Sequence, residues 1–487
     1  MPVVDRRTFL GLAASATLAG CATQKATGPA QGTSAFVSPG GPEVSAAEQA
    51  RKPGRVRDFA LTATANGLTW SYGGIVPGRE LRVTAGEVVR ARLDNRLPEA
   101  TSIHWHGLAL RNDADGVPGV TQEPIAAGAA HTYEFTAPHA GTYWFHPHSG
   151  TQFDRGLFGA LVIEDPAEPL GYDQEWVVVL DDWLDADPDE ALAELKKGMS
   201  GDHSMKHMLM GATSPLLGGD AGDVRYRDFR INGRTAADPQ TFTAKPGTRV
   251  RIRLINAGGD TAFRVALDGH TMTLTHTDGF PLAHSETDAL LIGMGERYDV
   301  LVTLKDGLFP LVALAEGKKA VARALVRTGS GRAPAPDFRP RALDGRVARY
   351  GKLRPAEHVR LPARQPDRTI TLRLTGSMSR YDWAFNGKPY DPAVREPIAA
   401  GERVRLRFVN TTTMWHPVHL HGHTYAHADT GIRKDTSIVL PGMTLEADFD
   451  ADNPGIWMVH CHNVYHQESG MMTLLGYRVQ SGGSGSR

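Results

Sequence analysis

Apolar and charged residues alternate in one short pattern that occurs three times along the chain. Each copy has a glycine, then Val-Arg-x-Arg followed by an apolar residue, and finally an asparagine, over residues 86–95, 247–256 and 401–410. This alternation has the period of a half-buried β-strand entered from a glycine turn. The three glycines lie 161 and 154 residues apart, which is the length of a domain rather than of a solenoid repeat. We therefore predict three similar β domains.

A second marker indicates the same periodicity. Asn-Gly pairs begin at Asn232 and Asn386, each 15 residues before the repeat glycine of its segment. The predicted parts of the chain are a signal over 1–21, a flexible tether over 22–54, domain 1 over 55–166, domain 2 over 167–340 and domain 3 over 360–480. Strand-like runs dominate all three domains, with one expected helix near 187–197.

Composition supports an all-β fold and excludes some partners. The 53 glycines and 31 prolines fit a protein with many turns, and antiparallel Greek-key β-sandwiches are the expected architecture. The 53 basic and 54 acidic residues balance, so neither nucleic acid nor a charged membrane surface is an expected partner.

The N-terminus resembles an export signal. Arg6-Arg7 precedes an apolar run from Leu10 to Ala19, which is too short to span a bilayer. Leu18-Ala19-Gly20-Cys21 looks like a lipobox, in which Cys21 would carry the lipid, and a plain cleaved signal is the alternative. We expect twin-arginine export of the folded protein to the periplasm or cell envelope, with a lipid anchor at Cys21.

Ten of the 20 histidines fall in four short motifs that resemble metal-ligand clusters. The motifs are His104-Trp-His106, His146-Pro-His148, His416-Pro-Val-His419-Leu-His421, and His460-Cys461-His462 with His466. His104 follows the first repeat asparagine by nine residues, as His419 follows the third. The equivalent positions of domain 2 are Val265 and Leu267, so domain 2 is predicted to be a spacer between two ligand-bearing domains.

Cys461 is predicted to face a different metal from its two neighbours. On a strand, His460 and His462 point to one side and Cys461 to the other. The side chains of His416, His466 and Met471 complete, with this cysteine, the ligand set of a blue copper site. Two histidines, one thiolate and a weak thioether favour electron transfer, and the adjacent histidines offer a short path to a second site.

These four motifs resemble those of the multicopper oxidase family, and the resemblance covers nearly all of the chain beyond the signal. It implies cupredoxin-like domains and four coppers. The implied type 1 ligands are Cys461, His416, His466 and Met471; the type 2 ligands are His104 and His419; the type 3 ligands are His106, His146, His148, His421, His460 and His462. The resemblance also implies one-electron oxidation of a substrate and four-electron reduction of dioxygen to water by an enzyme that we expect to be a monomer.

Oxygen reduction consumes protons, so acidic residues are expected near the type 2 and type 3 coppers. Asp115 resembles the acid that the family places near the type 2 copper, whereas an Asp before Gly116 alone would indicate a turn. Many bacterial members have a glutamate directly after the second type 1 histidine. Gln467 occupies that position here, and Glu468 is the substitute that the sequence offers.

A methionine-rich insertion between Gly198 and Gly211 suggests a substrate. Its thioethers and imidazoles suit Cu(I), and the same composition would also suit a mobile apolar lid. The candidate residues for substrate copper are Met199, His203, Met205, His207, Met208, Met210 and, beside the first type 1 histidine, Met414. We expect Cu(I) oxidation for copper tolerance, with activity on phenols. The alternatives are a general laccase, a non-catalytic copper-binding lipoprotein and a copper nitrite reductase.

Overall fold

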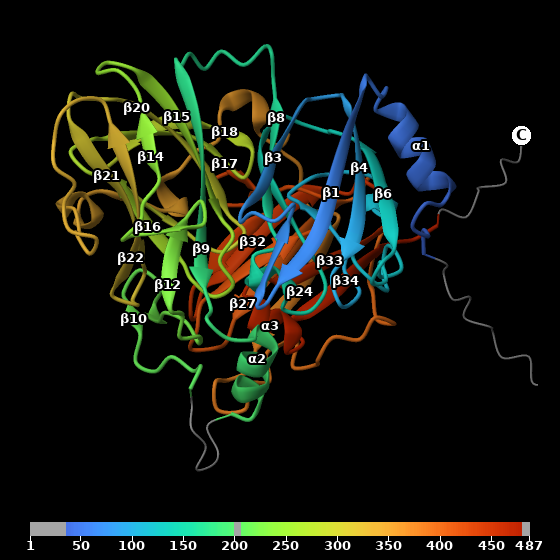
Figure 1. The fold of residues 1–487 in the computed structure, drawn as a ribbon. Coiled ribbons are helices and arrows are strands. Elements are labelled where there is room, and N and C mark those ends of the chain that lie inside the picture. Colours follow the sequence, from blue (N-terminus) through green and yellow to red (C-terminus); the bar gives the residue numbers. More distant parts are fainter. Residues whose placement is uncertain (1–35, 199–205, 480–487) are drawn as a thin grey trace, which may run out of the picture. The chain divides into compact units, whose positions relative to one another are not determined.

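The computed structural model describes residues 36–198 and 206–479 (Figure 1). Most of its strands fall into three successive pairs of β-sheets. The predicted all-β fold is confirmed. Within these residues, no helix combines the length and apolar character needed to cross a bilayer. The predicted signal, with Arg6, Arg7 and Cys21, lies outside the described residues.

Domain 1 contains two four-stranded sheets that share one hydrophobic core. The first, in the order β2-β1-β4-β6, is formed by Thr69–Tyr72, Val56–Asn66, Val88–Arg96 and Ala130–Thr136. The second, in the order β3-β8-β7-β5, is formed by Gly78–Thr84, Gly159–Glu164, Gly141–His146 and His104–His106.

Domain 2 contains the largest sheets. One has the order β13-β12-β9-β15-β20-β17-β18, with strands Arg234–Thr235, Asp228–Ile231, Gln174–Trp183, Arg249–Asn256, Arg297–Thr303, Met272–Thr277 and Phe280–Thr287. The other has the order β14-β22-β21-β16-β19-β23, with strands Thr241–Thr243, Ala320–Arg327, Leu308–Ala315, Phe263–Leu267, Ala289–Ile292 and Val347–Ala348. The last of these strands lies beyond residue 340, the predicted end of domain 2. A small ladder pairs β10 (Thr213–Ser214) with β11 (Gly219–Asp220).

Domain 3 repeats the arrangement of domain 1 with longer sheets. One has the order β25-β24-β27-β32-β29-β30, with strands Ala384–Phe385, Arg368–Thr375, Arg403–Asn410, Thr444–Asp450, Tyr425–His427 and Arg433–Lys434. The other has the order β26-β34-β33-β28-β31, with strands Glu396–Ile398, Met472–Tyr477, Ile456–Cys461, His416–Leu420 and Thr436–Val439.

The repeated pattern forms the same strand in each domain, namely β4, β15 and β27. Its glycines, Gly86, Gly247 and Gly401, have φ values of +86°, +83° and +85°, as the predicted turn requires. The final asparagine is buried and ties down the next loop; Asn410, for example, donates from its side chain to the carbonyls of Met414 and Val439. That loop leads directly to His416, so the repeat places the strand that carries His416 and His419, two of the predicted ligands.

The expected antiparallel pairing does not extend to every strand of these sandwiches. The first long strand of each domain pairs in parallel with the repeat strand: β1 with β4, β9 with β15, and β24 with β27. Between these two strands the chain adds one strand to the partner sheet: β3 in domain 1, β14 in domain 2 and β26 in domain 3. This crossover lets the chain re-enter the first sheet in the same direction. Hydrophobic alternation specifies the face of a strand and leaves its direction open.

The flexible tether predicted over 22–54 is wrong for its second half. Helix α1 spans Pro42–Ala50, with proline at its first turn and Val44 buried. The Glu48 side chain accepts from the backbone N–H of Thr136, and Arg51 donates to Asn453, so this segment packs on domains 1 and 3. The helix predicted near 187–197 is confirmed as α2, Pro188–Lys196.

Candidate metal centre

The eight histidines of the i, i+2 pairs converge from equivalent strands of domains 1 and 3. In domain 1, His104 of β5 lies opposite His146 of β7. In domain 3, His419 of β28 lies opposite His460 of β33. Stacked rings join the two domains, because His104 lies 3.9 Å from His421 and His106 lies 3.8 Å from His419, measured between ring centroids. The strands thus form one interdomain cluster of imidazoles.

Most of the clustered imidazoles have one ring nitrogen held by the protein. His104 Nδ1 lies 2.8 Å from the Asp115 carbonyl oxygen, and His421 Nδ1 lies 2.9 Å from the Asp115 carboxylate. Because carbonyl and carboxylate oxygens only accept, these ring nitrogens donate and their Nε2 atoms keep a lone pair. His460 follows the same rule, with Nδ1 2.9 Å from the carbonyl of Cys461. His462 differs, since neither of its ring nitrogens has a partner among the described residues.

Within the described part of the chain, several of the other ring nitrogens are buried and lack a hydrogen-bond partner. They are His104 Nε2, His106 Nδ1, His146 Nε2, His148 Nε2, His419 Nε2 and both nitrogens of His462. His421 Nε2 and His460 Nε2 face each other at 3.0 Å. Buried polar atoms normally find partners, so this many orphaned imidazole nitrogens fit a site that holds metal ions. Three triads of these histidines have ligand atoms within 4.8 Å of one another.

Burial also keeps these imidazoles ready to bind metal. Burial lowers the pKa of His146, His148 and His462 well below the usual range, and the neighbouring histidines lower it further. The rings are therefore neutral near pH 7, and neutral imidazole is the form that binds a metal ion.

A second site lies on the other face of β33. Cys461 is fully buried, and its Sγ atom lies 3.7 Å from Nδ1 of His416 and 3.6 Å from Nδ1 of His466. Met471 is also buried, and its carbonyl accepts from the Cys461 N–H at 3.0 Å. The prediction that the cysteine and its neighbours serve different sites fits this geometry. A thiolate with two imidazoles suits copper.

Family comparisons identify the chain. Multicopper oxidase family profiles match residues 57–168, 174–330 and 363–481. The chain is 46% identical to "Multicopper oxidase MmcO" of Mycobacterium tuberculosis, across 97% of this chain and 96% of that protein. This protein belongs to the multicopper oxidase family. It is thus a copper-dependent oxidoreductase that uses oxygen, with four coppers of types 1, 2 and 3.

Other relatives of this multicopper oxidase carry two kinds of name. A "Copper resistance protein A homolog" of Pseudomonas syringae pv. tomato is 30% identical, over 96% of this chain and 98% of that protein. The crystal structure of a laccase from Botrytis aclada superposes with a TM-score of 0.73 at 25% identity, covering 89% of this chain and 90% of that one. Fet3p, described as functioning in iron import, shares the fold at a TM-score of 0.72.

The predicted acids have different surroundings. Asp115 is fully buried beside the imidazole cluster, with its carboxylate next to His421 and 3.3 Å from His104. Glu468 instead accepts from the Gln467 side chain, and its carbonyl accepts from Lys196 of α2. Among the described residues, the hydrogen bonds of Glu468 include none to a clustered histidine.

The methionine-rich insertion is only partly described, since Met199, His203 and Met205 lie outside the described residues. Met208 is buried in the hydrophobic core, and its backbone forms an isolated β-bridge with Val224. Met210 is 53% exposed. His207 contacts Glu194 of α2, and its Nε2 atom is buried with no partner in the described part of the chain. Met414 is buried near the second site, and its backbone forms an isolated β-bridge with Asp220.

Two carboxylates that contact the predicted ligand histidines were not predicted from the sequence. Asp223 of domain 2 accepts from His466 Nε2 at 2.8 Å, while Thr412 contacts His416 Nε2 at 2.9 Å. Asp435 lies between His106 and His419. Neither aspartate belongs to a local motif, and each meets its histidine only through the fold.

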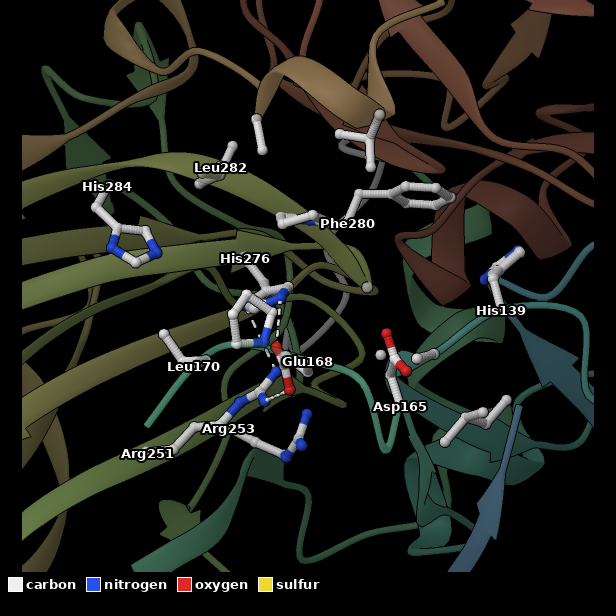
Figure 2. Close-up of a pocket in the computed structure, with 18 of the residues that line it drawn as sticks. His139, Asp165, Glu168, Leu170, Arg251, Arg253, His276, Phe280, Leu282 and His284 are labelled. Carbon is white, nitrogen blue, oxygen red and sulfur yellow. Dashed lines mark hydrogen bonds and ion pairs between the residues drawn. The ribbon is translucent and has the colours of Figure 1, made fainter. Parts of the chain in front are cut away.

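The histidines of domain 2 make contacts of their own, away from the imidazole cluster. His276 pairs with Glu168 at 3.0 Å and lines a cavity of about 410 Å³, together with Arg251 and His284 (Figure 2). Of the predicted copper ligands that the structure describes, none lines this cavity. His270 accepts from the Lys305 N–H and contacts the Asp268 carbonyl.

Domain 2 nevertheless touches the imidazole cluster through Gly295. A Cβ atom there would lie 2.9 Å from His462 and 3.0 Å from His106. We expect Gly295→Ala to lose at least one copper per chain and to unfold several degrees lower in temperature. Gly247→Ala is the matched control, because that glycine has nearly the same positive φ, and among the described residues an added Cβ would meet no atom within 4 Å. Copper analysis and thermal unfolding of both variants test this expectation, and equal copper contents would contradict it.

Proposed function

We propose that this multicopper oxidase oxidises Cu(I), and also phenols, at the Cys461 site and passes the electrons to dioxygen at the imidazole cluster. The assigned type 1 ligands are His416, Cys461, His466 and Met471. The assigned type 2 ligands are His104 and His419, and the type 3 ligands are His106, His146, His148, His421, His460 and His462. The observation that carries this assignment is the set of buried imidazole nitrogens without partners in the described part of the chain.

The backbone of β33 supports coupling between the two sites. Cys461 is bonded on both sides to residues of the cluster, His460 and His462. Bound copper supplies the one-electron chemistry. In the overall reaction, four substrate Cu(I) ions, one dioxygen and four protons yield four Cu(II) ions and two waters. The protein holds Cys461 and the two histidines in one buried segment, which excludes water from the path between the sites.

Asp115 is the proposed proton donor of the cluster. Asp115→Asn keeps an oxygen that can accept from His421, but it removes the proton-carrying group. We expect kcat with a phenol to fall about 100- to 1,000-fold while copper content is retained. Oxygen uptake and metal analysis measure both quantities. Asp113→Asn is the matched control, because Asp113 lies in the same loop and forms its ion pair with Arg111. A kcat within two-fold of wild type would refute this role.

Three observations support Cu(I) as a substrate. Relatives are named as copper resistance proteins. The insertion that carries the methionines follows α2, and Gly198 at its start lies so close to domain 3 that an added Cβ would collide with the Ser379 carbonyl. Asp223, which follows the insertion, contacts His466 directly and places a carboxylate beside the type 1 ligands. Laccase relatives support the phenol activity.

The substrate proposal is tested by replacing Met199, Met205 and Met210 together with leucine. Leucine keeps the volume and apolar character of a lid but removes the thioether that binds Cu(I). We expect oxygen uptake with Cu(I) to fall about ten-fold, a loss of about 1.4 kcal/mol, while the phenol rate stays unchanged. Met272→Leu in the core of domain 2 is the control. Unchanged rates with both substrates would favour a general laccase with an apolar lid.

Export and anchoring complete the proposal. The Arg6-Arg7 pair and the segment 18–21 support transport of the folded protein to the cell envelope, with a lipid on Cys21. Cys21→Ala is expected to move the oxidase from the membrane fraction to the soluble fraction of the envelope. The same distribution for wild type and variant would indicate a plain cleaved signal.

A further inference from the structure

Asp435 lies between one clustered histidine of domain 1 and one of domain 3. Its Oδ1 atom is 3.2 Å from Nε2 of His106 and 3.4 Å from Nδ1 of His419. Thr436 donates to the same oxygen at 2.8 Å. Nδ1 of His419 lies closer to the main-chain carbonyl of Asp435, at 3.0 Å, and the Thr436 hydroxyl contacts both rings at 3.0 and 3.1 Å. The fully buried Asp435 therefore helps to orient His106 through its carboxylate and His419 through both its carboxylate and its carbonyl.

Arg297 of domain 2 holds that carboxylate with both arms of its guanidinium. Nη1 donates to Oδ1 of Asp435 at 2.7 Å, and Nη2 donates to Oδ2 at 2.6 Å. Within the described residues, Arg297 is the one hydrogen-bond partner of Oδ2. Arg297 also donates from Nε to the carbonyl of Thr142 in domain 1, and from Nη1 to the carbonyl of Gly295 in domain 2. One unexposed side chain thus joins all three domains.

A glycine next to His106 provides the space that the Arg297–Asp435 ion pair occupies. Gly107, directly after His106, has a φ of +88°, and a Cβ there would collide with Nη2 of Arg297 and lie 2.6 Å from Oδ2 of Asp435. Any larger residue would push the pair away from the ring of His106. The glycine that follows the first histidine motif therefore admits the guanidinium beside the cluster.

We propose that Arg297 is a positioning residue of the imidazole cluster, the proposed site of the type 2 and type 3 coppers. It fixes Asp435, which in turn orients His106 and His419 and directs their free nitrogens to the metal. Domain 2, predicted to be a spacer, would then complete a site whose ligands all come from domains 1 and 3. This inference rests on the proposed assignment of the eight imidazoles as copper ligands.

The planar fork of arginine explains why this residue is used. A guanidinium binds both oxygens of a carboxylate in a fixed geometry, whereas an ammonium binds as a point charge. Two more buried groups flank the pair: Asp278, 3.6 Å from Arg297, and Lys434, 3.2 Å from Asp278. Arg297→Met would leave the carboxylate of Asp435 with hydrogen bonds on one oxygen only, so it could turn away from the two rings. Among the described residues, His106 would then be held by Thr436 alone, and His419 by Thr436 and the Asp435 carbonyl.

The test compares Arg297→Met, Arg297→Lys and Arg251→Met in the full-length protein. Arg251 is the matched control, since it is a similarly buried arginine of domain 2 that pairs with Asp299. It also pairs with Glu168 (Figure 2). The readouts are copper per chain, the type 2 EPR signal, and the blue absorption of the type 1 site. Among the described residues, the hydrogen bonds of Arg297 include none to the type 1 ligands, so the blue absorption reports folding of domain 3 within the same molecule.

Arg297→Met is expected to keep the blue absorption and lose about half or more of the cluster copper, because removal of an outer-sphere partner weakens metal binding about 10- to 100-fold. Arg297→Lys should restore part of the copper with an altered type 2 signal, and Arg251→Met should bind copper as wild type does. If Arg297→Met yields no soluble protein, the altered type 2 signal of Arg297→Lys carries the test.

Two results would overturn the inference while leaving the proposed function intact. One is wild-type copper content and type 2 signal in both Arg297 variants. The other is an equal loss of cluster copper in Arg251→Met. Wild-type protein that binds copper only at the type 1 site would instead overturn the ligand assignment, and this inference with it.

Discussion

Replacing Cys461 with serine is expected to abolish the blue absorption and to lower the rate of substrate oxidation by more than about 100-fold. Loss of an outer-sphere partner already costs up to about 100-fold, and loss of a metal ligand should cost more. The hydroxyl is a poor ligand for Cu(I), and the change removes the sulfur atom that lies close to Nδ1 of both His416 and His466. His460 and His462 remain in place, so the variant should still bind copper in the imidazole cluster. Oxygen uptake, absorption spectroscopy and copper analysis measure the three outcomes.

Met471→Leu is the matched control for the cysteine variant. The thioether is a weak axial ligand, and leucine fills a similar volume. We expect this variant to keep both the blue colour and oxidase activity, with a changed reduction potential. Retained substrate oxidation in Cys461→Ser would show that electrons enter the cluster by another route.

Copper loading is expected to raise the melting temperature by about 15 °C. Each copper at about 1,000 times its Kd contributes roughly 4 kcal/mol, and the family binds four. Unfolding entropy of about 2.1 cal/mol/K per residue means that 1 kcal/mol shifts the Tm of a chain this long by about 1 °C. The orphaned imidazole nitrogens supply the physical reason, because copper gives them a partner that the described part of the chain does not. Calorimetry of apo and loaded protein measures the shift.

Mg²⁺ provides the control for the melting experiment. It prefers oxygen ligands and should leave the melting temperature of the apo protein unchanged. A copper-induced shift below about 3 °C would indicate that the cluster does not form as assigned.

The clustering of the predicted ligand histidines could be anticipated because two simple periods coincide. Side chains alternate across a strand, and the repeat fixes where each ligand strand begins relative to Asn95 or Asn410. His104 and His419 therefore reach equivalent places, and both lie in the cluster. Parallel pairing of β1 with β4 could not be predicted in this way, since alternation is the same for either strand direction.

The groups that contact the predicted ligand histidines could not be identified from local sequence. Arg297 and Asp435 are 138 residues apart, and Asp223 and His466 are 243 residues apart. Each pair meets only after the domains have packed. Helix α1 was not predicted for a different reason. Val44 is its one buried residue, so the segment has almost no apolar periodicity.

Quantitative copper analysis combined with EPR on the fully loaded protein tests most directly whether the two sites hold copper as assigned. We expect four coppers per chain, of which one gives the type 1 signal, one gives the type 2 signal and two are silent as a coupled pair. One copper per chain with a type 1 signal alone, or four coppers that are all visible by EPR, would contradict the assignment.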